Sequence, residues 1–177
     1  MTRARNPVTT WGSTPGERAD CYPCDGLLEQ PDLVAFRATA VGAPAPILFR
    51  WVCQLRVAPY SYDLIDNLGR RSPRQLTPGV EQLEVGQRWM TIFRLVDFDP
   101  GRSVTLLHRG PLFGQVAVTY RVAAASARSS RIVAKVLAKS RFDFGRRAFA
   151  ALLGVGDVVM MRRQLLNLKA LAEQDAR

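Results

Sequence analysis

The chain has 177 residues, of which 47% are hydrophobic, and it carries a formal net charge of +10. This length fits one globular domain with a single core, and no apolar run is long enough for a transmembrane helix. Because the opening residues lack the apolar centre of a signal peptide, we expect a cytoplasmic protein. The 25 basic residues are spread over every segment, so no specific nucleic-acid site is expected.

Residues 1–31 are rich in proline and glycine and show no sustained periodicity. We therefore expect an irregular N-terminal arm ahead of a domain that covers 32–177. Cys21 and Cys24 form a CYPC spacing in this arm, whereas redox CxxC motifs lie between a strand and a helix. A zinc site would need four ligands, and only Cys53 and the single histidine could complete one. Neither redox nor metal chemistry is predicted, and no cofactor is expected.

The domain begins with a strand over 33–41, and its apolar face consists of Val34, Phe36, Ala38 and Ala40. Arg37 and Thr39 point to the other face. Apolar residues at helical spacing then predict a short helix after Pro44. A second short helix is predicted over Tyr60 to Leu68, closed by Gly69, and a loop follows over 70–80.

Four strand-like runs follow, at 87–98, 102–109, 113–122 and 131–139. The short turns between them imply an antiparallel meander. One face of this sheet is apolar and the other polar, so we expect a helix on one side and water on the other. The inward set is Val104, Leu106, His108, Val116, Val118, Tyr120, Val122, Ile132, Ala134, Val136 and Ala138.

The last long segment predicts an amphipathic helix from near Ala151 to Glu173, roughly 35 Å long. Apolar residues recur along it at spacings of three and four: Val158, Met161, Leu165, Leu168 and Ala172. Its first turns are apolar nearly all round apart from Asp157, so we expect this end to be the more deeply buried one. The helix should lie on the inner face of the sheet.

This order of elements resembles that of the START-like, or SRPBCC, superfamily, which includes polyketide cyclases, aromatases and lipid-transfer domains. The strongest local resemblance is APYSYDLIDNLGRRSP at 58–73, which is similar to the YSYDW-(I/L)-(D/E)-N segment of bacterial polyketide-cyclase-like members. The resemblance covers 33–173. It implies an α+β helix-grip fold, in which a curved antiparallel sheet wraps around the long C-terminal helix, with two short helices after the first strand and an apolar cavity inside.

The resemblance implies that a small hydrophobic, aromatic or lipid-like molecule binds in this cavity. Small residues such as Ala134 and Ala138 either leave room for a ligand or let the helix approach closely. One alternative is a cofactor-independent cyclase, aromatase or dehydratase that acts in the cavity. A second is a basic protein that docks on anionic lipid or nucleic acid, whose binding would fall steeply with salt. The sequence predicts no oligomeric state.

Three residues are candidates for catalysis. His108 is the only histidine and has apolar strand neighbours, so it could exchange a proton with a ligand or meet water at the rim. Asp63 and Asp66 lie three residues apart in the second short helix. They could share acid–base work if desolvated, or they could cap the helix and hold nearby arginines. The sequence has no Walker A, GxGxxG, GxSxG or HExxH motif, so nucleotide-driven, serine-hydrolase and zinc-dependent reactions are not expected.

Other side chains are predicted to contact the ligand. Arg94 shares its parity with Ile92 and Val96, so it could bind an anionic group of the ligand or pair with Asp157. Tyr120 could donate its hydroxyl or form a wall. The remaining predicted ligand-binding residues are aromatic or thioether side chains, namely Trp51, Tyr60, Tyr62, Trp89, Met90 and Met161.

Overall fold

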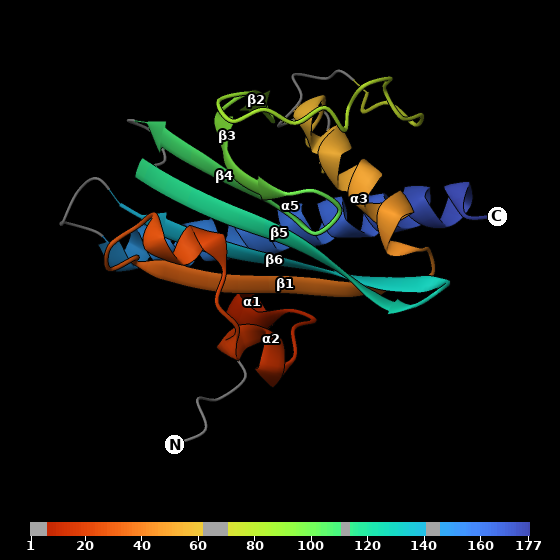
Figure 1. Ribbon diagram of the computed structural model, residues 1–177. Helices are drawn as coiled ribbons and strands as arrows, with labels where there is room; N and C mark the ends of the chain where they lie inside the picture. Colours follow the sequence, from red (N-terminus) through yellow and green to blue (C-terminus); the bar gives the residue numbers. More distant parts are fainter. Residues whose placement is uncertain (1–6, 62–70, 111–113, 141–145) are drawn as a thin grey trace.

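A single antiparallel sheet organises the protein (Figure 1). The computed structural model describes residues 7–61, 71–110, 114–140 and 146–177, and for 146–158 it describes the backbone only. Within these residues, six strands pair in the order β1-β6-β5-β4-β3-β2. Their bounds are β1 (Leu33–Val41), β2 (Arg88–Trp89), β3 (Phe93–Asp99), β4 (Ser103–Gly110), β5 (Gly114–Ser126) and β6 (Ser129–Lys139).

Strands β3 to β6 form the predicted meander, because each one pairs with the next along the chain. Strand β1 joins this meander along β6. One predicted strand is broken, however: the run 87–98 contains β2 and β3, which fold back on each other so that Trp89 pairs with Phe93. The break falls at Met90 and Thr91, whose φ angles are 42° and 68°. Positive φ is incompatible with a continuous strand.

Helix α3 (Ala45–Cys53) follows β1 and leads into the 3₁₀ turn η2 (Gln54–Arg56). Pro46 lies in its first turn, where a missing N–H costs nothing, and its buried face consists of Leu48, Phe49, Trp51, Val52 and Cys53. The predicted second helix falls mostly on 62–70, outside the described residues. Tyr60 itself has a φ of 55°, so no helix begins there.

Helix α5 (Arg146–Asp175) lies on one face of the sheet, behind it in Figure 1. The predicted stripe is confirmed where side chains are described, because Met161, Leu165, Leu168 and Ala172 are buried in the core. Two contacts fix the end of the helix against the end of β1. Lys169 Nζ donates to Ala40 O at 2.8 Å, and Glu173 Oε1 accepts the Gly42 N–H at 2.7 Å.

The face of β1 that was predicted to be apolar lies on the outer side of the sheet. Its register with β6 places Leu33, Ala35 and Arg37 beside the inward residues Ala138, Val136 and Ala134. Arg37 is 0% exposed, and its Nη1 donates to the Phe36 carbonyl at 2.9 Å. The even-numbered residues, predicted to form the apolar face of the strand, lie on the outer face, where Phe36 and Ala38 are buried by the arm.

The arm is more ordered than the predicted irregular segment. It contains α1 (Pro7–Thr10), α2 (Pro15–Ala19) and the 3₁₀ turn η1 (Pro23–Gly26). Helices α1 and α2 lie beyond the β1 edge of the sheet, below it in Figure 1, and the Arg162 guanidinium of α5 lies 5.6 Å from the centroid of the Trp11 ring, which follows α1. The residues around η1 lie against the outer face of the sheet, on the side away from α5. A second core forms beneath the arm from Tyr22, Cys24, Leu28, Phe36, Ala38, Ala117, Val133 and Leu137. The outer face of the sheet, predicted to be wet, is therefore covered over β1, β6 and β5.

Polar contacts fasten the arm to this face. Lys135 Nζ lies 2.5 Å from Asp25 Oδ1, and the Arg121 guanidinium stacks 4.0 Å from the Tyr22 ring centroid. The Ala38 N–H donates to Trp11 O at 3.0 Å, so the arm occupies a hydrogen-bonding position along the free edge of β1. Covering an edge strand in this way protects it from pairing with another chain.

Candidate ligand-binding interior

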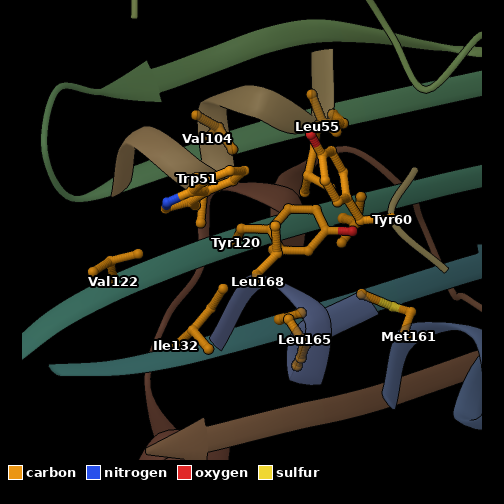
Figure 2. Packing of buried hydrophobic residues seen from close by; sticks show 14 of the residues in the cluster. Trp51, Leu55, Tyr60, Val104, Tyr120, Val122, Ile132, Met161, Leu165 and Leu168 are labelled. Carbon is orange, nitrogen blue, oxygen red and sulfur yellow. The ribbon is translucent and has the colours of Figure 1, made fainter. Parts of the chain in front are cut away.

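Two aromatic rings from the α3 side face the space between the sheet and α5. Trp51 and Tyr60 pack edge to face, with ring centroids 6.1 Å apart, and Figure 2 shows both beside Tyr120. The Trp51 indole N–H donates to Asp175 Oδ2 at 2.8 Å, and the Tyr60 hydroxyl donates to Pro73 O at 2.5 Å. Their polar atoms are thus already hydrogen-bonded within the protein, and the rings contribute apolar surface to the interior.

A buried polar pair lies at the centre of this apolar interior. Tyr120, which is 2% exposed, donates its hydroxyl to Gln164 Oε1 at 2.7 Å. Gln164 Nε2 in turn donates to Pro59 O at 2.6 Å and lies 3.4 Å from Met90 Sδ. This chain of contacts joins β5, α5 and the segment after η2. Away from water such bonds are strong, so they fix how α5 meets the sheet.

Helix α5 also holds the segment that precedes residues 62–70. Arg163 Nε donates to Ser61 O at 3.0 Å, and Asn167 Nδ2 donates to Tyr60 O at 2.8 Å. Together with the Gln164 bond to Pro59, these contacts engage three successive carbonyl groups. The predicted candidates Tyr62, Asp63 and Asp66 begin directly after this clamp. They lie outside the described residues.

His108 lies near the end of β4 and is half-buried. Its Nδ1 is 2.9 Å from Ile92 O in the turn between β2 and β3. A carbonyl oxygen only accepts, so Nδ1 carries the hydrogen of this contact and a neutral ring keeps its lone pair on Nε2. The imidazole packs on Phe93 with a centroid distance of 5.8 Å. A Cβ at Gly110 would lie 2.7 Å from Nε2, so this glycine makes room for the ring.

Arg94 does not face the interior, so its predicted orientation is wrong. It is exposed and donates to Gly86 O at 2.9 Å. It pairs with the exposed Arg88 on the outer side of the sheet. The turn at 90–92 breaks the alternation between Ile92 and Arg94 on which the prediction depended. Its proposed partner Asp157 belongs to the part of α5 whose side chains are not described.

Trp89 and Met161 both lie in the interior core, with exposures of 0% and 8%. The Trp89 indole N–H has no hydrogen-bond partner among the described residues. The structure thus brings Trp51 together with Tyr60 and links Tyr120 to Met90 through Gln164. It leaves Arg94 apart from them.

Sequence reasoning missed Gln164 and the burial of Arg37. Gln164 lies three residues after Met161 and four before Leu168, so it belongs to the buried stripe of α5. A polar residue inside an apolar stripe was the available signal. The sequence did contain a signal for Arg37. It shares a strand face with Leu33, Ala35 and Val41, and these residues are as apolar as those on the opposite face.

The cysteines show no redox arrangement. All three are free; Cys21 is exposed, whereas Cys24 of η1 is buried between the arm and the sheet. Burial raises the pKa of the Cys24 thiol, and it raises that of Cys53 to about 12. Reactive cysteines have lowered pKa values, so burial disfavours the reactive thiolate form of Cys24 and Cys53. Within the described ranges, no cluster of His, Cys, Asp and Glu side chains could hold a metal ion.

No protein-family model matches the chain, and no curated protein matches its sequence. Solved structures do match. The di-domain aromatase/cyclase BexL from the BE-7585A biosynthetic pathway superimposes with a TM-score of 0.53 at 15% identity, over 79% of this chain and 46% of BexL. The di-domain aromatase/cyclase StfQ from the steffimycin pathway gives 0.51 at 14% identity, over 82% and 52%. This chain therefore spans about half the length of each di-domain protein.

A hypothetical protein from Helicobacter pylori gives a TM-score of 0.54 at 11% identity, over 90% of this chain and 96% of that protein. At these identities the likeness concerns the fold. In the parts of the chain that are described, no helix is both long and apolar enough to span a membrane. The six-stranded sheet, the helix α5 laid along it and the shared architecture with the two aromatase/cyclases lead to one conclusion. The chain has the α+β helix-grip fold, with an antiparallel sheet packed on a long C-terminal helix, that was predicted from its sequence.

Proposed function

We propose that the protein binds a small hydrophobic, aromatic or lipid-like molecule between the sheet and α5. The observation that carries this proposal is the Tyr120–Gln164 pair, a hydroxyl and an amide set inside an apolar interior. Ligand sites combine an apolar lining with a few placed polar groups. The fold shared with two aromatase/cyclases supports the same function.

The surrounding side chains suit such a ligand. Trp51 and Tyr60 offer flat apolar surface, and their polar atoms are already engaged. Met90 and Met161 contribute thioethers, which adapt to ligands of different shape. A ligand in this interior would meet aromatic faces on the α3 side and aliphatic residues from the sheet and α5.

The test uses N-phenyl-1-naphthylamine, a neutral probe that fluoresces in apolar surroundings. We expect saturable binding that changes little between about 50 and 200 mM salt, whereas docking of an anionic partner on the basic surface would weaken steeply. Ala134→Leu fills the inner face beside Tyr120, with which Ala134 is paired, and should weaken binding. Ala124→Leu, on an exposed part of β5, is the matched control. Equal binding by both variants would contradict the proposal.

The position of His108 favours a second candidate, cofactor-independent cyclisation or dehydration of the bound molecule. When Nδ1 donates its hydrogen to Ile92 O, a neutral ring carries its lone pair on Nε2, the atom that would accept a proton from the ligand. His108→Asn retains a donor for Ile92 O and removes the base. If His108 is the base, this variant should lose turnover of a poly-β-ketone thioester by about 10²-fold or more and still bind the probe. Unchanged turnover would exclude this role for His108.

A further inference from the structure

Trp89 projects into the interior although it belongs to the shortest strand. It pairs with Phe93, which has the parity of the buried Leu95, and Leu95 pairs with the buried Leu106 of β4. The neighbouring Arg88 is exposed, so the two residues of β2 point to opposite faces of the sheet. Trp89 is 0% exposed and belongs to the core cluster between the sheet and α5.

The backbone around this side chain is fixed. The Met90 N–H donates to Leu55 O at 3.3 Å, which holds the end of β2 against η2. The Met90 sulfur lies 3.4 Å from Gln164 Nε2, the amide that also belongs to the Tyr120 pair. Trp89 therefore directly precedes a residue that contacts the polar centre of the interior.

The indole N–H of Trp89 is the unusual feature. It is buried and has no acceptor among the described residues, whereas the equally buried Trp51 donates its N–H to Asp175. Native structures pair nearly all buried donors, and an unpaired one carries a desolvation cost that a ligand acceptor can remove. A buried donor that faces the interior without an acceptor is thus suited to binding a ligand atom.

We propose that the Trp89 indole N–H donates a hydrogen bond to an oxygen acceptor of the bound molecule, such as an aromatic ketone or quinone carbonyl. This inference rests on the proposed function and specifies which end of the ligand lies near β2. It also predicts selectivity. A hydrocarbon of the same shape would leave the N–H unpaired, so it should bind roughly tenfold more weakly.

The test compares 9-fluorenone with fluorene, which share a planar tricyclic shape and differ in the carbonyl group. The protein has three tryptophans, so its ¹H–¹⁵N spectrum should contain three indole signals, assigned from single Trp→Phe variants. Fluorenone should move the Trp89 signal downfield as a hydrogen bond forms. The Trp51 signal, already hydrogen-bonded to Asp175, and the Trp11 signal serve as internal references. Fluorene should not produce this downfield shift.

Trp89→Phe removes the donor and should weaken fluorenone binding about tenfold with little change for fluorene. Trp51→Phe makes the same chemical change where the N–H is already used, so it should leave the fluorenone-to-fluorene ratio unchanged. If wild-type protein binds fluorenone without a Trp89 shift, or binds both compounds equally, the inference is wrong and the proposed function stands. If neither compound binds, both are wrong. If Trp89→Phe fails to fold, the wild-type titrations with fluorenone and fluorene still test whether the Trp89 N–H donates to the ligand.

Discussion

The Gln164 side chain accepts a hydrogen bond from the Tyr120 hydroxyl of β5 and donates one to the Pro59 carbonyl. One side chain of α5 therefore connects the helix to the sheet and to the segment after η2. Tyr120→Phe would leave Gln164 Oε1 buried without that donor. We expect a loss of about 1–3 kcal/mol in the free energy of unfolding, measured by urea denaturation.

The double variant Tyr120→Phe/Gln164→Leu is the control for this prediction. Because Gln164→Leu alone already breaks the pair, the losses of the two single variants should not add. The double variant should be more stable than their sum predicts by about 0.5–3 kcal/mol. Simple additivity would show that the two side chains do not interact.

Glu173 predicts a pH dependence. The hydrogen bond that it accepts from the Gly42 N–H lowers the pKa of its carboxyl below the ordinary value of 4.5. Burial opposes this effect in part, and Lys169 lowers the pKa further. A lowered folded-state pKa stabilises the protein above the unfolded-state pKa, and this contribution is lost as the pH falls through the folded value.

Glu173→Gln should therefore lower the free energy of unfolding at pH 7 by about 0.5–1 kcal/mol. The difference from wild type should shrink once the pH falls below about 4.5. Glu84→Gln, which alters an exposed side chain, is the control and should have little effect at any pH. A wild-type advantage that persisted well below the ordinary pKa of a glutamate would contradict the role given to the Glu173 charge.

Individual orientations were the hardest features to predict from the sequence. Alternation fixes which residues share a face, as it did for the inward residues of β4, β5 and β6. It does not say which face is inner when both are apolar, and in β1 the arm provides a second apolar environment for Phe36 and Ala38. The predicted orientation of Arg94 was wrong for a different reason. The turn at Met90–Thr91–Ile92 contains no glycine, proline or asparagine that would signal it in the sequence.

At the scale of elements, the arm depends on Gly12. Its φ is +72°, and a Cβ there would lie 1.9 Å from Ala38 O, on the strand edge that the arm covers. Gly12→Ala should detach the first part of the arm and cost at least about 1 kcal/mol. Faster hydrogen exchange of the Ala38 amide, which donates to Trp11 O, would report the detachment.

Gly26→Ala is the matched control, because a Cβ at this position meets no atom within 4 Å. It should leave both the Ala38 exchange rate and the stability nearly unchanged. Equal exchange rates in the two variants would show that the close approach at Gly12 does not anchor the arm.

For the whole molecule, the order of strands and helices was sufficient to predict the fold. The short turns imply that successive strands pair as antiparallel neighbours. The single long amphipathic helix needs an apolar sheet face on which to pack. The contents of the interior could not be obtained in this way, because they depend on long-range contacts. The Tyr120–Gln164 bond joins residues 44 positions apart, and no local pattern encodes that distance.

The central claim is that a small molecule binds between the sheet and α5. The most direct measurement is a set of intermolecular nuclear Overhauser effects between bound 9-fluorenone and ¹³C-labelled methyl groups. Binding in the interior predicts contacts to the buried Leu106, Val118 and Leu165. Contacts confined to the exposed Val34, Val85 and Ile92 would place the molecule on the surface and contradict the claim.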